Sequence, residues 1–127
     1  MEELISRITQ STGLDAAVVE KAVGLILAFL AKEGPQEEVN RLFDAMPGAQ
    51  QAVATSGDGG PDEGGGGLMG AMGGGVMALG SKLMAAGVPM GQMQPLGREL
   101  FAYGREKAGE DVMGPIVGGV PGLSQFV

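Results

Sequence analysis

The chain has 127 residues, a formal net charge of −7 and no His, Cys or Trp. A chain of this length forms one small domain, or two very small ones that share a core. The missing residue types remove the commonest general base, the commonest thiolate nucleophile and the two best zinc ligands. Because no basic stripe offsets the acids, the composition also argues against a nucleic-acid partner.

The first third of the chain predicts three helices. Residues 2–10 carry their apolar side chains on one side, as in a short amphipathic helix. Residues 15–33 are apolar around most of the helix circumference, which is typical of a central helix with neighbours on several sides. A third helix over 35–46 ends at Pro47-Gly48, and residues 49–54 have room for one more turn.

Residues 55–67 interrupt the helical pattern. They contain seven Gly, one Pro and three acids but no large apolar side chain. Such a segment cannot recover its ordering entropy by burial, so we expect a flexible, acidic, Gly-rich linker. The linker divides the chain into an N-terminal helical half, 1–54, and a C-terminal helical half, 68–127.

The C-terminal half opens with a segment rich in Gly and Met. From Met69 to Met93, apolar residues recur at alternating spacings of three and four, as in a heptad seam. From Gly66 to Ala78, small residues recur at every fourth position, a ridge at which two helix backbones can approach closely. We therefore expect a helix over 68–86 that is stable only when it is packed. The candidate interface residues are Met69, Gly70, Met72, Gly74, Val76, Leu79, Leu83, Met90 and Met93.

Two further helices complete the prediction. One runs from about residue 91 to 107, and Pro95 is tolerable only within its first turn, where the amides have no helical partner anyway. The other opens with Glu110 and Asp111 and ends at Pro121-Gly122. Together the elements predict an all-α fold of about six helices in two related halves, packed as a small bundle and joined by the linker.

The two halves share a pattern of helix ends. Lys32-Glu33-Gly34 precedes Pro47-Gly48 in the first half, and Lys107-Ala108-Gly109 precedes Pro121-Gly122 in the second, at nearly the same spacing. A repeated pattern of this kind indicates two copies of one helical unit. Pro95 and Pro115 in the second copy have no equivalents in the first.

In these Lys-x-Gly and Pro-Gly units the chain resembles a group of small bacterial all-helical proteins known only as domains of unknown function. The resemblance covers about residues 13–53 and 87–127. It implies a helical fold and a bacterial origin. It brings no catalytic residue to this sequence.

The six Met between residues 69 and 93 allow three interpretations. Thioethers are ligands for Cu(I), but no His or Cys is present to complete such a site, so this interpretation is the weakest. Met side chains can also line an adaptable groove for a partner helix. The strongest interpretation is plain core packing, in which Met fills the irregular gaps that Gly-rich helix contacts leave.

The sequence offers no catalytic or cofactor site. The segment Gly80-Ser81-Lys82 is similar to the end of a phosphate-binding loop, but its Lys and Ser stand in reversed order and no strand precedes it. Pairs of acids such as Glu37 and Glu38 lie at helix starts, where the helix dipole accounts for them. No nucleophile lies beside a base, so we expect no enzyme, no cofactor, no metal and no small-molecule substrate.

We expect a non-catalytic interaction or assembly protein that associates with itself, or with another protein, through the Gly/Met-rich helix. The alternative is reversible association with a membrane or another apolar surface through residues 68–93. The first residues lack the basic and apolar regions of a signal peptide, which predicts a cytoplasmic location. The longest apolar run, from Ala22 to Ala31, is shorter than the roughly 20 residues of a membrane-spanning helix.

Overall fold

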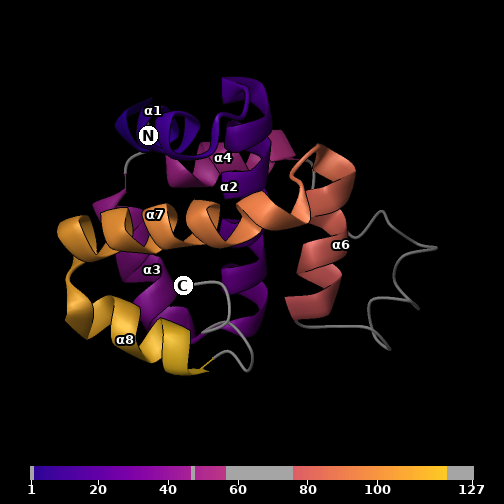
Figure 1. The fold of residues 1–127 in the computed structure, drawn as a ribbon. Helices are drawn as coiled ribbons and strands as arrows, with labels where there is room; N and C mark the ends of the chain where they lie inside the picture. The colour runs from indigo at the N-terminus through magenta and orange to yellow at the C-terminus, as the bar shows by residue number, and fades with distance from the viewer. Residues whose placement is uncertain (1, 47, 57–75, 120–127) are drawn as a thin grey trace.

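The computed structural model describes residues 2–46, 48–56 and 76–119, and nearly all of them are helical (Figure 1). The described residues contain no strand, which confirms the predicted all-α class. Most of the predicted linker, and the Pro121-Gly122 pair, lie outside them. The seven helices are α1 (Glu2–Thr12), α2 (Ala16–Glu33), α3 (Gln36–Ala45), α4 (Ala49–Ser56), α6 (Val76–Ala86), α7 (Met90–Ala108) and α8 (Glu110–Gly119).

Helix α2 is the centre of the fold (Figure 1). Every residue from Ala22 to Leu30 is buried, and the helix contacts α1, α3, α4 and α6. A helix with neighbours on so many sides keeps no face for polar side chains over its central turns. The apolar circumference of residues 15–33 therefore predicted the position of this helix correctly.

Helices from both predicted halves share one core. Helix α1 packs on α7, α3 packs on both α7 and α8, and α6 packs on α2. Buried side chains from all seven described helices form a single apolar cluster. In Figure 1, α7 crosses in front of α2, and α8 lies next to α3, which it contacts.

Helix α4 is longer than the single turn predicted for residues 49–54. It runs from Ala49 to Ser56 and packs on α2, with Ala49 and Ala52 buried. Alanine carries too little apolar surface to give a periodic signal in the sequence. The same small side chain lets α4 lie close to α2, and this contact supports α4 as a helix of its own.

Helices α7 and α8 each contain a proline beyond the first turn. Pro95 is the sixth residue of α7, and Pro115 is the sixth residue of α8. The prediction that Pro95 lies within the first turn is therefore wrong. Proline has no backbone N–H, so the backbone oxygen four residues earlier accepts no helical hydrogen bond from it. These oxygens belong to Gly91 in α7 and Asp111 in α8. Both of these residues are exposed, so water can reach their backbone oxygens.

The two glycines of the repeated Lys-x-Gly units both follow a helix, but in different conformations. Gly34 has φ −87°, and a Cβ at this position would lie 2.8 Å from the backbone oxygen of Leu30. Gly109 has φ 92° and ψ 162°, a region that only glycine occupies readily, with open space around it. The first position thus needs glycine for close approach, and the second needs it for its backbone angles.

Gly109→Ala is expected to lower the free energy of unfolding by about 1–3 kcal/mol, because a Cβ strains this backbone conformation. The matched control is Gly80→Ala inside α6, where a Cβ would meet no atom within 4 Å. That change should raise stability by about 0.5–1 kcal/mol through helix propensity. Urea unfolding followed by circular dichroism measures both. Equal stability of the Gly109→Ala and wild-type proteins would contradict the strain.

Candidate interaction surface

The nine residues of the predicted interface fall into four groups. Leu79, Leu83 and Met93 are buried, at 2%, 0% and 7% exposure. Met90, at the start of α7, is 75% exposed. The structure includes Val76 as the first residue of α6 without describing its side chain. The remaining four, Met69, Gly70, Met72 and Gly74, lie outside the described residues.

Leu79 and Leu83 anchor α6 to the core. They lie one helical turn apart and so share a face, and α6 packs on α2. The apolar seam therefore belongs to the core at these two positions. Among the described Met side chains of the segment, however, only Met93 is buried, whereas Met84 and Met90 are exposed, so core packing accounts for the methionines only in part.

The connection between α6 and α7 is tightly held. The N–H of Gly87 donates to the carbonyl oxygen of Met84 at 3.1 Å, and the N–H of Val88 donates to that of Leu83 at 3.0 Å. Val88 is 1% exposed and is part of the apolar core cluster. A buried anchor in the turn leaves its neighbours Met84, Pro89 and Met90 on the outside.

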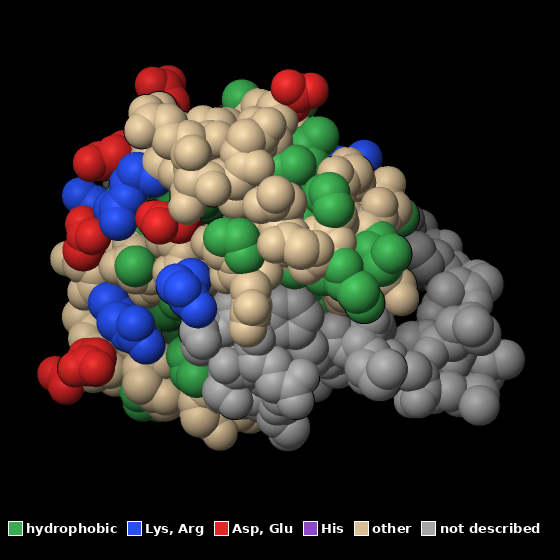
Figure 2. All heavy atoms as spheres, viewed as in Figure 1, with side chains coloured by type: hydrophobic (Ala, Val, Ile, Leu, Met, Phe, Trp, Pro, Cys, Tyr) green, Lys and Arg blue, Asp and Glu red, His purple; other side chains and the backbone are tan. Residues whose placement is uncertain are grey.

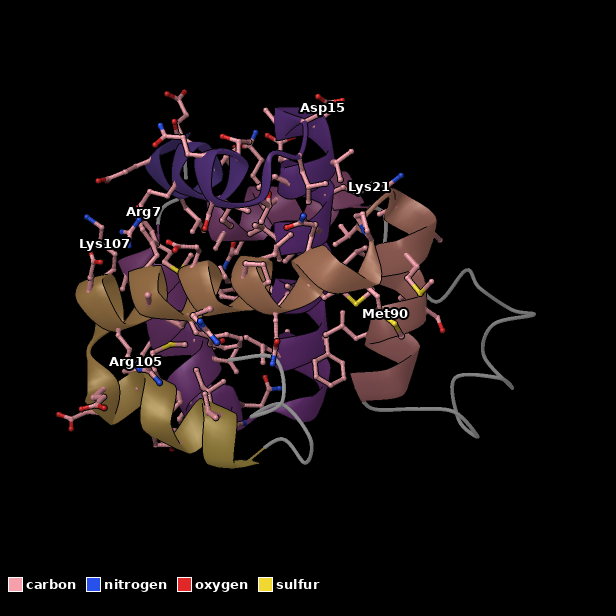
Figure 3. All side chains as sticks on the ribbon, viewed as in Figure 1. Arg7, Asp15, Lys21, Met90, Arg105 and Lys107 are labelled. Atoms are coloured by element: carbon pink, nitrogen blue, oxygen red, sulfur yellow. The ribbon has the colours of Figure 1, made fainter. Side chains whose placement is uncertain are left out.

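These neighbours form an exposed apolar surface, which we call the apolar corner and define as Met84, Ala85, Pro89 and Met90. Met84 is 54% exposed and Met90 75% exposed, and both are large hydrophobic side chains. No Asp, Glu, Lys or Arg occurs between Leu83 and Gly97. In Figure 2, hydrophobic side chains gather over α6 and the start of α7, whereas most charged side chains lie on the opposite side. Figure 3 shows Met90 at the junction of the two helices.

The heptad seam identified Met90 but not Met84. Met84 follows the buried Leu83 directly, so it is rotated by about 100° from the buried stripe of α6. That rotation moves its side chain from the core to the surface. If residues 76–86 are projected on a helical wheel with Leu79 and Leu83 facing the core, Met84 falls outside the buried stripe. This projection could have located Met84 from the sequence.

A polar cluster joins α1 to α7 at a different place. Arg7 lies 3.1 Å from Glu106 and 3.7 Å from Glu99, and its guanidinium lies 5.8 Å from the centre of the Tyr103 ring. The Lys107 ammonium nitrogen lies 5.4 Å from the centre of the same ring. Figure 3 labels Arg7 and Lys107 near the C-terminal end of α7. These charged side chains have partners within the molecule, so the cluster is a contact between α1 and α7. Each exposed ion pair of this kind contributes about 0–1 kcal/mol to the free energy of unfolding.

Comparisons with known proteins add no family to this description. A scan of protein-family models, a search of curated proteins and a search of solved structures each find no match.

Within the described ranges, no group of three or more acidic residues is placed to hold a metal ion. Among the helices that these ranges contain, none has the length and apolar character needed to cross a membrane.

Proposed function

We propose that this chain is a non-catalytic interaction protein that associates with itself through the apolar corner. The observation that carries the proposal is the exposure of Met84 and Met90 in a stretch without charge. Exposed methionines are over-represented on surfaces that adapt to a partner, because the unbranched side chain repacks at low cost. The buried Leu79 and Leu83 hold α6 in place beneath this surface.

Charge restricts a contact between two copies to a surface such as the apolar corner. Two copies with a net charge of −7 repel one another over most of their surfaces. A two-fold contact through the apolar corner brings neutral surface against the same neutral surface. The acids of both copies then remain apart and in water.

Met90→Glu tests this proposal. It places one negative charge in the corner of each copy, so the charges face each other across a two-fold contact. We expect self-association, measured by sedimentation equilibrium, to weaken at least roughly tenfold. The free energy of unfolding should hardly change, because the side chain is 75% exposed.

Gln50→Glu on α4 is the matched control. Residue 50 is exposed, so the change adds the same charge away from the corner. Association of this variant should remain close to that of the wild type. A wild-type chain that stays monomeric at high concentration would overturn the proposal, as would equal weakening in the two variants.

The second candidate is reversible association with a membrane surface through residues 68–93. The same exposed methionines favour it, since apolar side chains without nearby charge can enter the lipid interface. Flotation with phosphatidylcholine vesicles, with and without anionic lipid, distinguishes the two candidates. Vesicle-bound wild type and unbound Met90→Glu would support the membrane over a second copy.

A further inference from the structure

Methionine is the only sulfur-containing residue of this sequence, which has nine Met and no Cys. Where the structure describes their side chains, the methionines fall into two sets. Met46, Met93 and Met113 are buried in the core, whereas Met84 and Met90 are exposed at the apolar corner. The chain thus holds one set of thioethers away from solvent and presents the other set to it.

Exposure decides which thioethers an oxidant can reach. A hydroperoxide converts methionine to its sulfoxide by transferring one oxygen to the sulfur atom. The O–O bond breaks as the S–O bond forms, the sulfur gives up two electrons, and the peroxide, which gains them, leaves as water or an alcohol. No cysteine thiol of this sequence competes for the oxidant.

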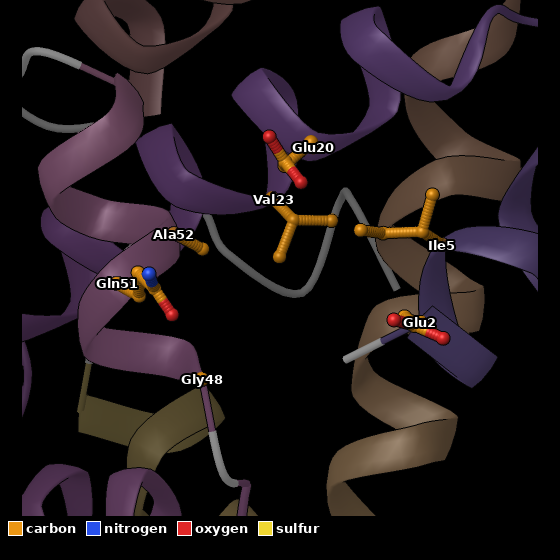
Figure 4. A pocket seen from close by; sticks show the side chains of 7 residues that line it. All are labelled: Glu2, Ile5, Glu20, Val23, Gly48, Gln51 and Ala52. Carbon is orange, nitrogen blue, oxygen red and sulfur yellow. The ribbon is translucent and has the colours of Figure 1, made fainter.

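Packing closes off the buried sulfur atoms. A Cβ added to Gly104 on α7 would lie 2.9 Å from the Sδ of Met113, so this sulfur is seated against the α7 backbone. A groove of about 360 Å³ lies between α1, α2 and α4, but no methionine lines it (Figure 4). An oxidant that enters the groove therefore meets no sulfur there.

We propose that Met84 and Met90 form a reversible oxidation site, and that their conversion to sulfoxides weakens self-association through the apolar corner. The effect on association rests on the function proposed above. A sulfoxide oxygen is a strong hydrogen-bond acceptor, and between two apolar surfaces it loses water without gaining a partner. The stretch from Leu83 to Gly97 has no Lys or Arg that could donate to it.

Oxidation at these two positions leaves the fold in place. The buried Leu83 and Val88 hold the end of α6 and the following turn in the core, and neither contains sulfur. Both exposed thioethers are open to an oxidant in the monomer, so oxidation withdraws monomers from association. Reduction by a thiol-dependent methionine sulfoxide reductase restores the thioether, as the oxygen leaves as water and two thiols become a disulfide.

Hydrogen peroxide is the probe for the site, and peptide mapping by mass spectrometry measures the oxygen gained at each methionine. At low protein concentration we expect Met84 and Met90 to oxidise at least roughly tenfold faster than Met46 and Met113. The difference should disappear in urea, where the chain is unfolded. The circular dichroism of the native chain should not change while only Met84 and Met90 are oxidised. Equal rates for the exposed and buried methionines of the native chain would overturn the site.

Sedimentation equilibrium during the same peroxide treatment tests the effect on association. We expect association to weaken at least about fivefold, in step with oxidation at Met84 and Met90, and to recover after reductase treatment. In the double variant Met84→Leu/Met90→Leu, which contains neither of these sulfur atoms, peroxide should leave association as it was before treatment.

Three results would overturn the control of association by this site. They are an oxidised wild type that associates as tightly as the untreated protein, a loss that follows oxidation of another methionine, and an equal loss in the double variant. A wild type that is monomeric before peroxide is added would instead overturn the proposed self-association, and the peptide map would still decide whether Met84 and Met90 are the oxidation site.

Discussion

Phe101→Ala is expected to lower the free energy of unfolding by about 3–5 kcal/mol. Phe101 is 1% exposed and is among the largest fully buried side chains of the described residues. It lies on α7, which packs against α1, α3, α6 and α8. Removal of the ring leaves a cavity at a helix that joins both halves of the chain. Because a domain of this size has a total stability of about 5–15 kcal/mol, the loss is a large part of it.

Phe43→Ala on α3 is the control, since its ring is only partly buried against the same core. Less apolar surface is re-exposed there and the surrounding residues can close the gap, so we expect a clearly smaller loss. Urea unfolding of both variants, monitored by circular dichroism, gives the two free energies. Equal losses would contradict the central position of Phe101.

Leu83→Ala is expected to lower the free energy of unfolding by about 2–5 kcal/mol. Leu83 is 0% exposed and belongs to the core cluster, so its truncation opens a cavity where α6 docks. Met90→Ala, at a side chain that is 75% exposed, should change stability by no more than about 0.5 kcal/mol. Thermal and urea unfolding at low protein concentration measure the monomer and keep association out of the comparison.

This pair of variants compares a core residue with a residue of the proposed interface within the same predicted seam. We expect Leu83→Ala to act on folding and, if the chain associates as proposed, Met90→Ala to act on association. If Leu83→Ala left unfolding unchanged but abolished self-association, Leu83 would be an interface residue, as the sequence pattern proposed. The structure instead predicts that the two effects are divided between the two residues.

Strong apolar patterns made most of the fold predictable. The nearly continuous apolar surface of α2 indicated a central helix, and the charged residues around α3 restricted its apolar side chains to one stripe. The patterns were weaker where small residues make the contacts. Ala49 and Ala52 pack α4 on α2, but Ala is too small to stand out in a periodicity.

The candidate surface was predictable only in part. The spacing from Met69 to Met93 selected Met90 together with Leu79, Leu83 and Met93, although the first is exposed and the other three are buried. A seam of apolar residues marks a helix face, but it does not say whether that face meets the core or water.

The sequence by itself determined the helical class and the central position of α2, because helix periodicity and end residues act over a few neighbouring positions. Only the tertiary structure decided which helices of the two halves contact each other and that Met84 and Met90 are exposed. It also decided that glycine is required at Gly34 and Gly109 for different reasons, although the two look equivalent in sequence. Gly34 lies close to the Leu30 backbone, and Gly109 has a positive φ. These outcomes depend on which surfaces meet across long separations in the chain, and local patterns do not specify that choice.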